Sequence, residues 1–387
     1  MHAGIIGGGM IARVHAHAVR ASGHEVLAAA SRDAASAQRA GQQTGAGEVH
    51  STPLELIEDP RVDVVHICSP NDTHPDLVLA ALEAGKHVIC EKPLATGRAD
   101  AQAMVDHWRT TDLVATVPFG YRFYSSIREL RARLSSAQDT PHLVRGTYLQ
   151  DWLSRPTDTN WRVDSAQGGQ SRAFADIGVH WCDLLEFVTG QRITSLIADL
   201  STVYDTRGKN SEPVTTEDAA VLVFRLDGGA LGSASISQAA PGHKNDLRIA
   251  VDTPVHSYEF HQEEPNTLWI GGREQTRIWN RADEDASPLS TAYDQSPGGH
   301  PQGWRDAFTS FVADTYRAAG GEKVDGLPTF DDGLRAAVLT DAVLSSAASG
   351  RWVDITDTPA ALEHFPHPSA RLRSVTDSPS NSKRNPS

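Results

Sequence analysis

The sequence predicts an α/β domain, built on a doubly wound parallel sheet, followed by an α+β domain. Three observations support this fold class. A chain of 387 residues is longer than one hydrophobic core usually serves. Its first third alternates short strand-like runs with helical runs, which is typical of parallel strands joined by crossover helices. Beyond Tyr121, long strand-like runs succeed one another with few helices between them, which indicates antiparallel pairing.

The first domain is expected to span residues 1–121. Its strands are predicted at 3–6, 25–30, 62–67, 87–90 and 113–117, with a weaker strand at 48–50. Its helices are predicted between them, at 11–21, 34–41, 76–84 and 99–110. Six strands within about 118 residues match the size of one complete dinucleotide-binding sheet.

The second domain is expected to span residues 122–360. Helices are predicted at 126–134 and from about Ala175, and "AAVLVFRLDGGALGSASIS" indicates a hairpin around its Asp-Gly-Gly turn. A sheet of antiparallel strands with one uncovered face favours an oligomer contact on that face. A late helix at 333–348 is expected to pack back on the first domain.

Composition limits the partners and the location. The 35 basic and 49 acidic side chains give a net charge of −14, which disfavours nucleic acids and anionic membranes and leaves a small-molecule ligand open. No apolar stretch has the length of a membrane helix, and "MHAGIIGGGM" lacks the features of a signal peptide, so we expect a cytoplasmic protein. Cys68, Cys90 and Cys182 follow no disulfide or zinc pattern, which fits a reducing compartment. Residues 366–387 lack apolar residues at core spacing and are predicted to be a disordered tail.

A glycine turn follows the first strand. Gly7, Gly9 and Ala12 have the G-x-G-x-x-A spacing between a predicted strand and a predicted helix. Gly7 permits the tight turn, Gly9 lets the main chain approach a pyrophosphate, and Ala12 allows close packing of helix on strand. Met10 and Ile11 open that helix, whose N-terminus suits phosphate groups. This context favours a dinucleotide site over an ordinary tight turn.

The second strand should end beside the adenosine ribose of such a cofactor. An NAD-specific site usually offers a carboxylate there, but this chain has Ser31 followed by Arg32. A hydroxyl and a guanidinium suit a 2′-phosphate, which favours NADP slightly and leaves NAD open. Arg32 could equally stack on adenine, with Asp33 opening the next helix.

Two further loops should reach the same crevice, because the carboxyl ends of parallel strands share one edge of the sheet. Ser69, Asn71 and His74 of "ICSPNDTHPDLVLAAL" follow the fourth strand and are expected to line the cofactor; a plain turn and helix cap is the alternative. Lys92 of "HVICEKPLAT" follows the fifth strand, and Pro93 would fix its direction. An ammonium placed there can donate to a substrate oxygen, whereas in an exposed loop it would be an ordinary solvated charge.

Another group of polar residues lies on the predicted helix of "GGQSRAFADIGVHWCDLLEFVTG". At about 100° per residue, Asp176, His180 and Asp183 share one stripe beside an apolar face. A carboxylate next to an imidazole orients its tautomer and stabilises the imidazolium, as a general base in alcohol oxidation requires. A surface charge pair and half of a metal site are the alternatives. No further ligands follow at metal spacing, so no metal is predicted.

These motifs together resemble those of the Gfo/Idh/MocA oxidoreductases, named for glucose-fructose oxidoreductase, inositol dehydrogenase and a rhizopine-catabolism protein. The resemblance rests on "AGIIGGGMIA", "SPNDTHPDL", "ALEAGKHVICEKPLA", "GYRF" and the helix with the acid and imidazole groups, and it covers residues 1–360. It implies an N-terminal Rossmann domain, a C-terminal domain with a large, mostly antiparallel open sheet, and homodimers or homotetramers formed through that sheet.

The resemblance also implies roles for single residues. Lys92 would contact the reacting hydroxyl, His180 would accept its proton, and Asp176 would complete the catalytic set. Cofactor contacts would come from Gly7, Gly9, Ser69, Asn71, His74 and Glu91, and from Trp161 and Arg162 of "NWRVD". One departure is Gln170, which stands where the family usually has a third glycine.

The sequence therefore predicts an NAD(P)-dependent dehydrogenase that oxidises a secondary hydroxyl of a sugar, sugar derivative or cyclitol, or reduces the corresponding ketone. A polyhydroxylated ligand would suit the polar side chains expected near the pocket, which are Lys92, Arg122, Gln150, Arg162, Asp176, His180 and Asp183. The alternatives are an NAD-dependent enzyme that cleaves glycosidic bonds and a non-catalytic cofactor-sensing regulator. The acid and base groups disfavour the regulator.

Overall fold

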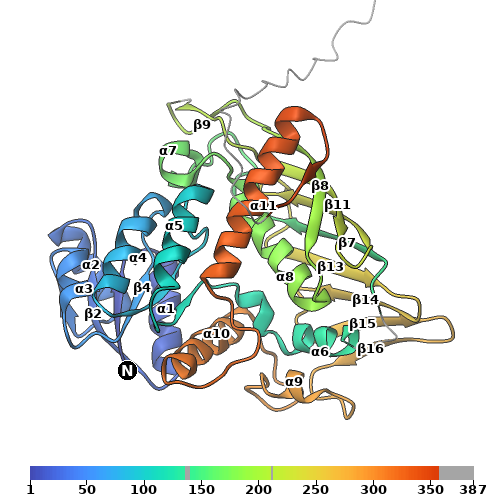
Figure 1. The fold of residues 1–387 in the computed structure, drawn as a ribbon, viewed down its shortest axis with the longest axis horizontal. Helices are drawn as coiled ribbons and strands as arrows, with labels where there is room; N and C mark the ends of the chain where they lie inside the picture. The colour runs from blue at the N-terminus through green and yellow to red at the C-terminus, as the bar shows by residue number, and fades with distance from the viewer. Residues whose placement is uncertain (136–139, 211, 357–387) are drawn as a thin grey trace, which may run out of the picture.

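The computed structural model describes residues 1–135, 140–210 and 212–356, which form two sheets with helices packed around them (Figure 1). The predicted tail at 366–387 lies outside the described residues, as do residues 357–360 of the predicted second domain.

The first sheet contains six parallel strands in the order β3-β2-β1-β4-β5-β6. They are β1 (His2–Ile6), β2 (Glu25–Ala30), β3 (Glu48–Val49), β4 (Val64–Ile67), β5 (His87–Cys90) and β6 (Ala115–Thr116). All six predicted strands are present. The strand order reverses at β1 and β4, and ligands of doubly wound sheets bind at the carboxyl ends of such a pair.

The helices of this part of the chain form two rows. One row contains α1 and α2, which contact each other, and the other contains α3, α4 and α5. Right-handed crossovers place the two rows on opposite faces of the sheet. The bounds are α1 (Met10–Ala21), α2 (Ala34–Thr44), α3 (Pro53–Glu58), α4 (His74–Glu83) and α5 (Arg98–Trp108). Only α3 was not predicted; it is a short helix capped by the Thr52 hydroxyl, with Pro53 in its first turn.

The second sheet contains nine strands in the order β16-β15-β14-β13-β7-β12-β11-β8-β17. Neighbouring strands are antiparallel except β7 and β12, which run parallel. Their bounds are β7 (Leu143–Leu149), β8 (Ile193–Ser201), β11 (Ala219–Leu226), β12 (Leu231–Ser237), β13 (Asp246–Asp252), β14 (His256–His261), β15 (Thr267–Gly272), β16 (Thr276–Asn280) and β17 (Val353–Asp354). The predicted hairpin is confirmed as β11 and β12.

Helices cover one face of this sheet. They include α6 (Ser125–Leu134), α8 (Val179–Thr189) and α11 (Phe330–Ser349), while the short α7 (Ser165–Gly168), α9 (Pro288–Thr291) and the strand pair β9 (Thr206–Arg207) and β10 (Glu212–Pro213) lie in connections. On β11, buried and exposed side chains alternate, and the exposed ones face away from the helices. Within the described residues, the second face of the sheet therefore carries no helix layer (Figure 1).

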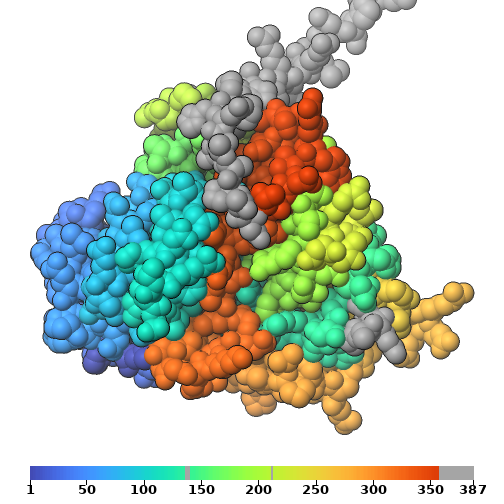
Figure 2. All heavy atoms as spheres, in the orientation of Figure 1, coloured from blue at the N-terminus to red at the C-terminus, as the bar shows by residue number. Residues whose placement is uncertain are grey.

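Two late helices tie the second part of the chain to the first. α10 (Trp304–Ala319) packs on α1, and α11 packs on α5 while also contacting β8. Each late helix thus extends one of the two helix rows of the parallel sheet. Figure 2 shows α10 and α11, in orange and red, between the blue first sheet region and the green and yellow second one.

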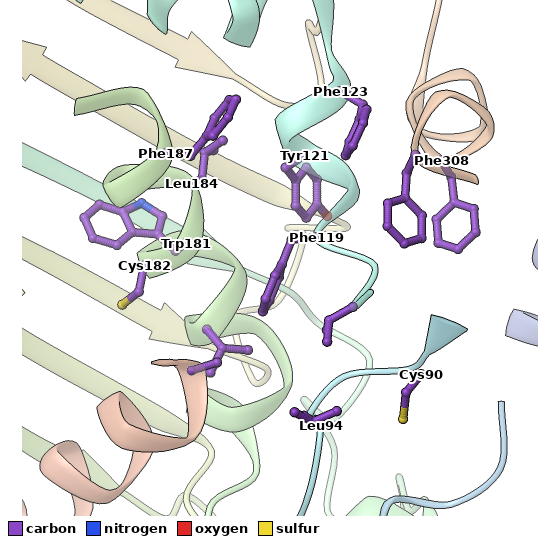
Figure 3. Packing of buried hydrophobic residues seen from close by; sticks show 14 of the residues in the cluster. Cys90, Leu94, Phe119, Tyr121, Phe123, Trp181, Cys182, Leu184, Phe187 and Phe308 are labelled. Atoms are coloured by element: carbon purple, nitrogen blue, oxygen red, sulfur yellow. The ribbon is translucent and has the colours of Figure 1, made fainter. Parts of the chain in front are cut away.

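Aromatic side chains fill the junction between the two parts. Phe119 and Tyr121 lie between Trp181 of α8 and Phe308 of α10, and all four are at most 5 % exposed (Figure 3). This packing fixes the end of the first sheet relative to α8. Among the described residues, no helix is both long and apolar enough to cross a membrane.

Candidate active site

The glycine turn has the geometry that a bound phosphate requires. Gly7 has φ +115°, and a Cβ there would lie 2.6 Å from the Cys68 carbonyl oxygen, so only glycine fits. A Cβ on Gly9 would meet no atom within 4 Å. No side chain caps the start of α1, which leaves the amides of Met10 and Ile11 in its first turn open to a ligand. The turn therefore fits the pyrophosphate of a dinucleotide.

The end of β2 leaves a cation available beside this turn. The Arg32 side chain is 86 % exposed and, among the residues that the structure describes, donates only to the neighbouring Asp33, at 3.2 Å. Asp33 itself caps α2 by accepting from the Ser36 amide. Ser31 is half-buried at the strand tip. Arg32 can therefore turn toward a ligand without breaking a buried contact.

Hydrogen bonds of buried side chains hold the loop after β4 in place. Asn71 is buried and donates to the Gly168 carbonyl at 3.3 Å, which ties the loop to the second part of the chain. His74 is 0 % exposed, and its two ring nitrogens lie 3.1 and 3.0 Å from the carbonyl oxygens of Ser69 and Pro93. This corrects the prediction that His74 lines the cofactor: its buried ring instead links the loop after β4 to the loop after β5.

Lys92 lies where the loop after β5 meets the helix that carries Asp176. The Lys92-Pro93 peptide is cis. Lys92 Nζ donates to Asp176 Oδ1 at 2.6 Å and to the Asp176 carbonyl oxygen at 2.8 Å. Gln238 Nε2 donates to Asp176 Oδ2 at 2.6 Å, and Arg162 Nε lies 3.4 Å from Oδ1. The carboxylate is thus held by two cations and one amide.

The charge state of Asp176 follows from these neighbours. Burial alone would raise the pKa of its carboxyl group, but the charges of Lys92 and Arg162 and the hydrogen bond from Lys92 outweigh it. The pKa of Asp176 therefore lies well below its usual range. The side chains of Lys92 and Asp176 are only 13 and 14 % exposed, so water screens the pair weakly.

His180 follows one turn later on the same helix. Its ring meets Phe119 and Tyr121 edge-on, with centroids 5.5 and 5.3 Å away. Burial and the charge of Lys92 hold the pKa of His180 well below its usual range, against a smaller opposing effect of Asp176. Among the described residues, none bonds its buried Nδ1. The His180 imidazole is therefore neutral, can accept a proton, and lies close enough to Lys92 to be affected by its charge.

The start of this helix differs from the regular geometry that the sequence suggested. A π-helical turn, Phe174–Gly178, precedes α8. The buried Glu217 carboxylate closes its first turn, accepting from the amides of Arg172 and Phe174 and from the Ser171 hydroxyl at 2.8 to 3.1 Å. Because π turns are frequent at functional sites, the irregular turn at Asp176 agrees with its position in the candidate site.

The predicted stripe on the helix divides into two groups. Asp183 does not reach the site: it pairs with Arg122, which also contacts Asp332 at the start of α11. The side chains of Arg122 and Asp183 are 8 and 7 % exposed. This corrects the prediction that both bind substrate, because their donors and acceptors are already used in a buried ion pair between helices.

A polar wall adjoins His180. Tyr121, Tyr148 and Asn245 form a closed ring of hydrogen bonds of 2.5 to 3.0 Å, and Gln150 donates to Asn245 Oδ1 at 2.8 Å. Burial raises the pKa of both tyrosines, so they stay neutral. Gln150, a predicted substrate contact, is therefore positioned by partners that the sequence did not reveal.

The predicted loop with Trp161 and Arg162 reaches the carboxylate of Asp176. The Arg162 guanidinium lies over the Trp161 ring, 4.4 Å from its centroid, and Arg162 also reaches Asp176. Sequence reasoning missed Gln238, Tyr148 and Asn245. Gln238 follows β12, Tyr148 belongs to β7, and Asn245 lies in the loop before β13. These elements become neighbours through strand pairing between residues far apart in the sequence.

Taken together, a dinucleotide turn on a parallel sheet and a lysine, aspartate and neutral histidine at the junction define a nicotinamide-dependent oxidoreductase. Family models support this class. Residues 1–119 match the model described as "Oxidoreductase family, NAD-binding Rossmann fold", and residues 128–254 match the Gfo/Idh/MocA C-terminal domain. The chain belongs to the Gfo/Idh/MocA oxidoreductase family.

Characterised relatives and solved structures agree. Levoglucosan dehydrogenase of Pseudarthrobacter phenanthrenivorans is 28 % identical over 92 % of this chain and 98 % of its own. Myo-inositol 2-dehydrogenase of Thermotoga maritima is 32 % identical over 65 % of this chain and 72 % of its own. A structure of levoglucosan dehydrogenase in complex with NADH and levoglucosan has a TM-score of 0.85 and 29 % identity, covering 92 % of this chain and 99 % of that one. An oxidoreductase domain protein from Kribbella flavida also gives 0.85, at 32 % identity, with the same coverage.

Proposed function

We propose that this oxidoreductase oxidises a secondary hydroxyl of a sugar, preferably a pyranose or an anhydropyranose, with a cyclitol as the second candidate. The observation that carries the proposal is the contact of Lys92 with Asp176 beside a neutral His180, at the edge of a dinucleotide crevice. Relatives that act on levoglucosan and on inositol support the substrate class. The levoglucosan enzyme spans almost the whole chain, which favours the pyranose.

The chain's own residues supply the proton chemistry. His180, neutral near pH 7, accepts the hydroxyl proton, and the Lys92 ammonium donates to the same oxygen as negative charge develops on it. Asp176 holds Lys92 in place and stabilises the imidazolium that His180 becomes. The nicotinamide ring, when bound, accepts the hydride. Gly7, Gly9 and the first turn of α1 would hold the phosphates of that cofactor.

The polar wall offers donors for the other hydroxyls of a sugar. Gln150 and Asn245 each use one amide hydrogen on a neighbour, which leaves a second amide hydrogen for a ligand. Arg162 adds a cation on the side of Asp176. Such convergent donors distinguish a polyhydroxylated ligand from an apolar alcohol, because an apolar ligand would leave them unpaired.

NAD binding follows from the family, and we propose in addition that NADP is accepted. Support comes from Arg32, which is exposed and unhindered at the end of β2, and from the absence of a carboxylate at Ser31. We also propose assembly as a homodimer or homotetramer through the uncovered face of the second sheet. A cytoplasmic location is the third proposal, supported by Cys68, Cys90 and Cys182, which are free and buried.

A substrate panel tests the proposal. The purified protein is mixed with NAD or NADP and with pyranoses, levoglucosan, inositols and simple secondary alcohols, and NADH or NADPH formation is followed by absorbance. We expect turnover with a pyranose or anhydropyranose, little with simple alcohols, and an increase in the KM for NADP, but not for NAD, in Arg32→Ala. Absence of reduced cofactor with every sugar, or Lys92→Ala activity equal to the parent, would refute the proposed function.

A further inference from the structure

A row of buried polar side chains runs behind the crevice. His15 on α1 and His66 on β4 are both 0 % exposed, and their Nδ1 atoms lie 2.8 Å apart. His15 Nε2 lies 3.0 Å from Glu91 Oε1, just after β5. His66 Nε2 lies 2.9 Å from the hydroxyl of Tyr316 on α10. Four separate elements thus meet through one hydrogen-bond chain, defined here as Tyr316, His66, His15 and Glu91.

The chain ends on a carboxylate. Burial alone would raise the pKa of Glu91, but the hydrogen bond from His15 and the charge of Lys92 act against burial, and the pKa lies below its usual range. A carboxylate only accepts hydrogen bonds, so His15 must donate from Nε2. Without that donor Glu91, which is 8 % exposed, would be a buried charge with one partner fewer.

Counting donors places the remaining hydrogens. One hydrogen lies between the two Nδ1 atoms. If it belonged to a doubly protonated His15, His66 would donate to Tyr316, and the Tyr316 hydroxyl hydrogen would have no acceptor among the described residues. With both rings neutral, Tyr316 donates to His66, His66 donates from Nδ1 to His15, and His15 donates to Glu91. Because this pattern uses every donor, we assign it.

Glu91 connects this hydrogen-bond chain to the candidate site. Its second carboxylate oxygen accepts from the main-chain N–H of Lys92 at 3.2 Å. The side chain of that same residue holds Asp176. The position of the Lys92 main chain, from which the ammonium extends, therefore depends on an acceptor that His15 fixes and His66 orients.

We propose that His15 and His66 are positioning residues for the reaction: through Glu91 they hold the Lys92 main chain so that its ammonium meets Asp176 and the reacting oxygen. This inference rests on the role of Lys92 in the proposed function. His15 lies on the helix whose first turn faces the cofactor phosphates, so the same chain also fixes α1 against the loop after β5.

Matched substitutions test the proposal. In His15→Gln the amide nitrogen can replace Nε2 as the donor to Glu91, whereas His15→Met has similar length and no donor. We expect kcat at saturating NAD to fall roughly tenfold or more in His15→Met, with kcat/KM falling in parallel, and to stay within about threefold of the parent in His15→Gln. His66→Asn, which keeps a donor near Nδ1, and His66→Leu should differ in the same direction.

A purely structural role would give a different result. Both His15 variants would then have a lower melting temperature than the parent, while kcat per folded molecule stayed near the parent value. That result would overturn the proposal. Lys92→Ala is measured in the same series. An inactive Lys92→Ala beside a fully active His15→Met overturns the positioning role alone, whereas an active Lys92→Ala overturns the proposed function.

A spectroscopic measurement on the unaltered protein covers the case in which the variants do not fold. Ring nitrogens of ¹⁵N-histidine report the tautomer directly by NMR. We expect hydrogen on Nε2 of His15 and on Nδ1 of His66. A neutral His66 that carries its hydrogen on Nε2 would break the chain as assigned and contradict the proposal.

Discussion

At the scale of the residue, burial and, after it, the charge on Lys92 hold the pKa of His180 below its usual range. In the proposed mechanism, oxidation requires neutral His180. Because the pKa of His180 lies below the ordinary value of about 6.5, kcat/KM should be level at neutral pH and fall only in more acidic solution. Lys92→Met removes a charge that lowers this pKa. The acid limb of the residual activity should therefore move to higher pH, and kcat should fall roughly 100-fold as a donor to the developing oxyanion is lost.

Steady-state kinetics across pH, with sugar and NAD, measures both effects. Lys244→Met is the control, because Lys244 is a 76 % exposed lysine paired with Asp151 on the surface. It should leave the pH profile unchanged. A Lys92→Met enzyme with reduced kcat and an unmoved acid limb would show that Lys92 does not set the pKa of His180.

The contact of Lys92 with Asp176, one turn before His180, joins residues that the sequence singled out for a local reason. Lys92, Asp176 and His180 each lie in a short motif whose position at a strand end or on a helix can be inferred from nearby residues. Arg122 and Asp183 could not be assigned in this way, because their partner Asp332 belongs to a helix far along the chain. Gln238, which follows β12, was also missed, because its contact with Asp176 joins residues that are 62 positions apart in the sequence.

At the scale of the element, the helix of Asp176 and His180 depends on Glu217. The sequence predicted this helix but not its π-helical turn, in which Gly178 lies so close to the Phe174 ring that a Cβ would approach it to 2.4 Å. Glu217 accepts from buried main-chain donors in the first turn. The negative charge also complements the helix N-terminus. The buried Glu217 carboxylate therefore fixes the direction in which the Asp176 side chain projects from the helix.

Replacement of this carboxylate should destabilise the fold and the site together. Glu217→Met leaves the amides of Arg172 and Phe174 without their acceptor, and we expect the free energy of unfolding to fall by about 1–3 kcal/mol. Glu217→Gln keeps one acceptor oxygen and should lose less. Denaturant titration measures the difference, with the exposed Glu212→Gln as control. Equal stability of Glu217→Met and the parent would contradict the capping role.

At the scale of the whole molecule, two sheets meet through helices and one sheet face is left uncovered. Antiparallel strands with few helices between them predicted a sheet with one free face, and the fold class is confirmed. The attachment of α10 to α1 could not be inferred from the sequence. α10 was not predicted, and the two helices lie far apart along the chain. The same attachment brings Tyr316 against His66.

The uncovered face carries apolar side chains that water would not favour. Val221 and Val223 of β11 are 54 and 42 % exposed, and Leu231 of β12 is 46 % exposed and pairs in register with Leu143 of β7. The register of β11 and β12 places these side chains on the same face of the sheet. Several exposed apolar side chains on one face of a sheet are typical of a surface that a second copy covers.

We therefore expect the protein to be a dimer or a tetramer in solution and the double variant Val221→Lys/Val223→Lys to shift it toward the monomer. Two lysines on each partner would bring like charges together in a face that must lose its water to pair. Light scattering after size-exclusion chromatography measures the mass. Val255→Lys, in the turn between β13 and β14 with Val255 49 % exposed, is the control and should keep the parent mass. A monomeric parent, or a double variant that keeps the parent mass, would place the contact elsewhere or exclude it.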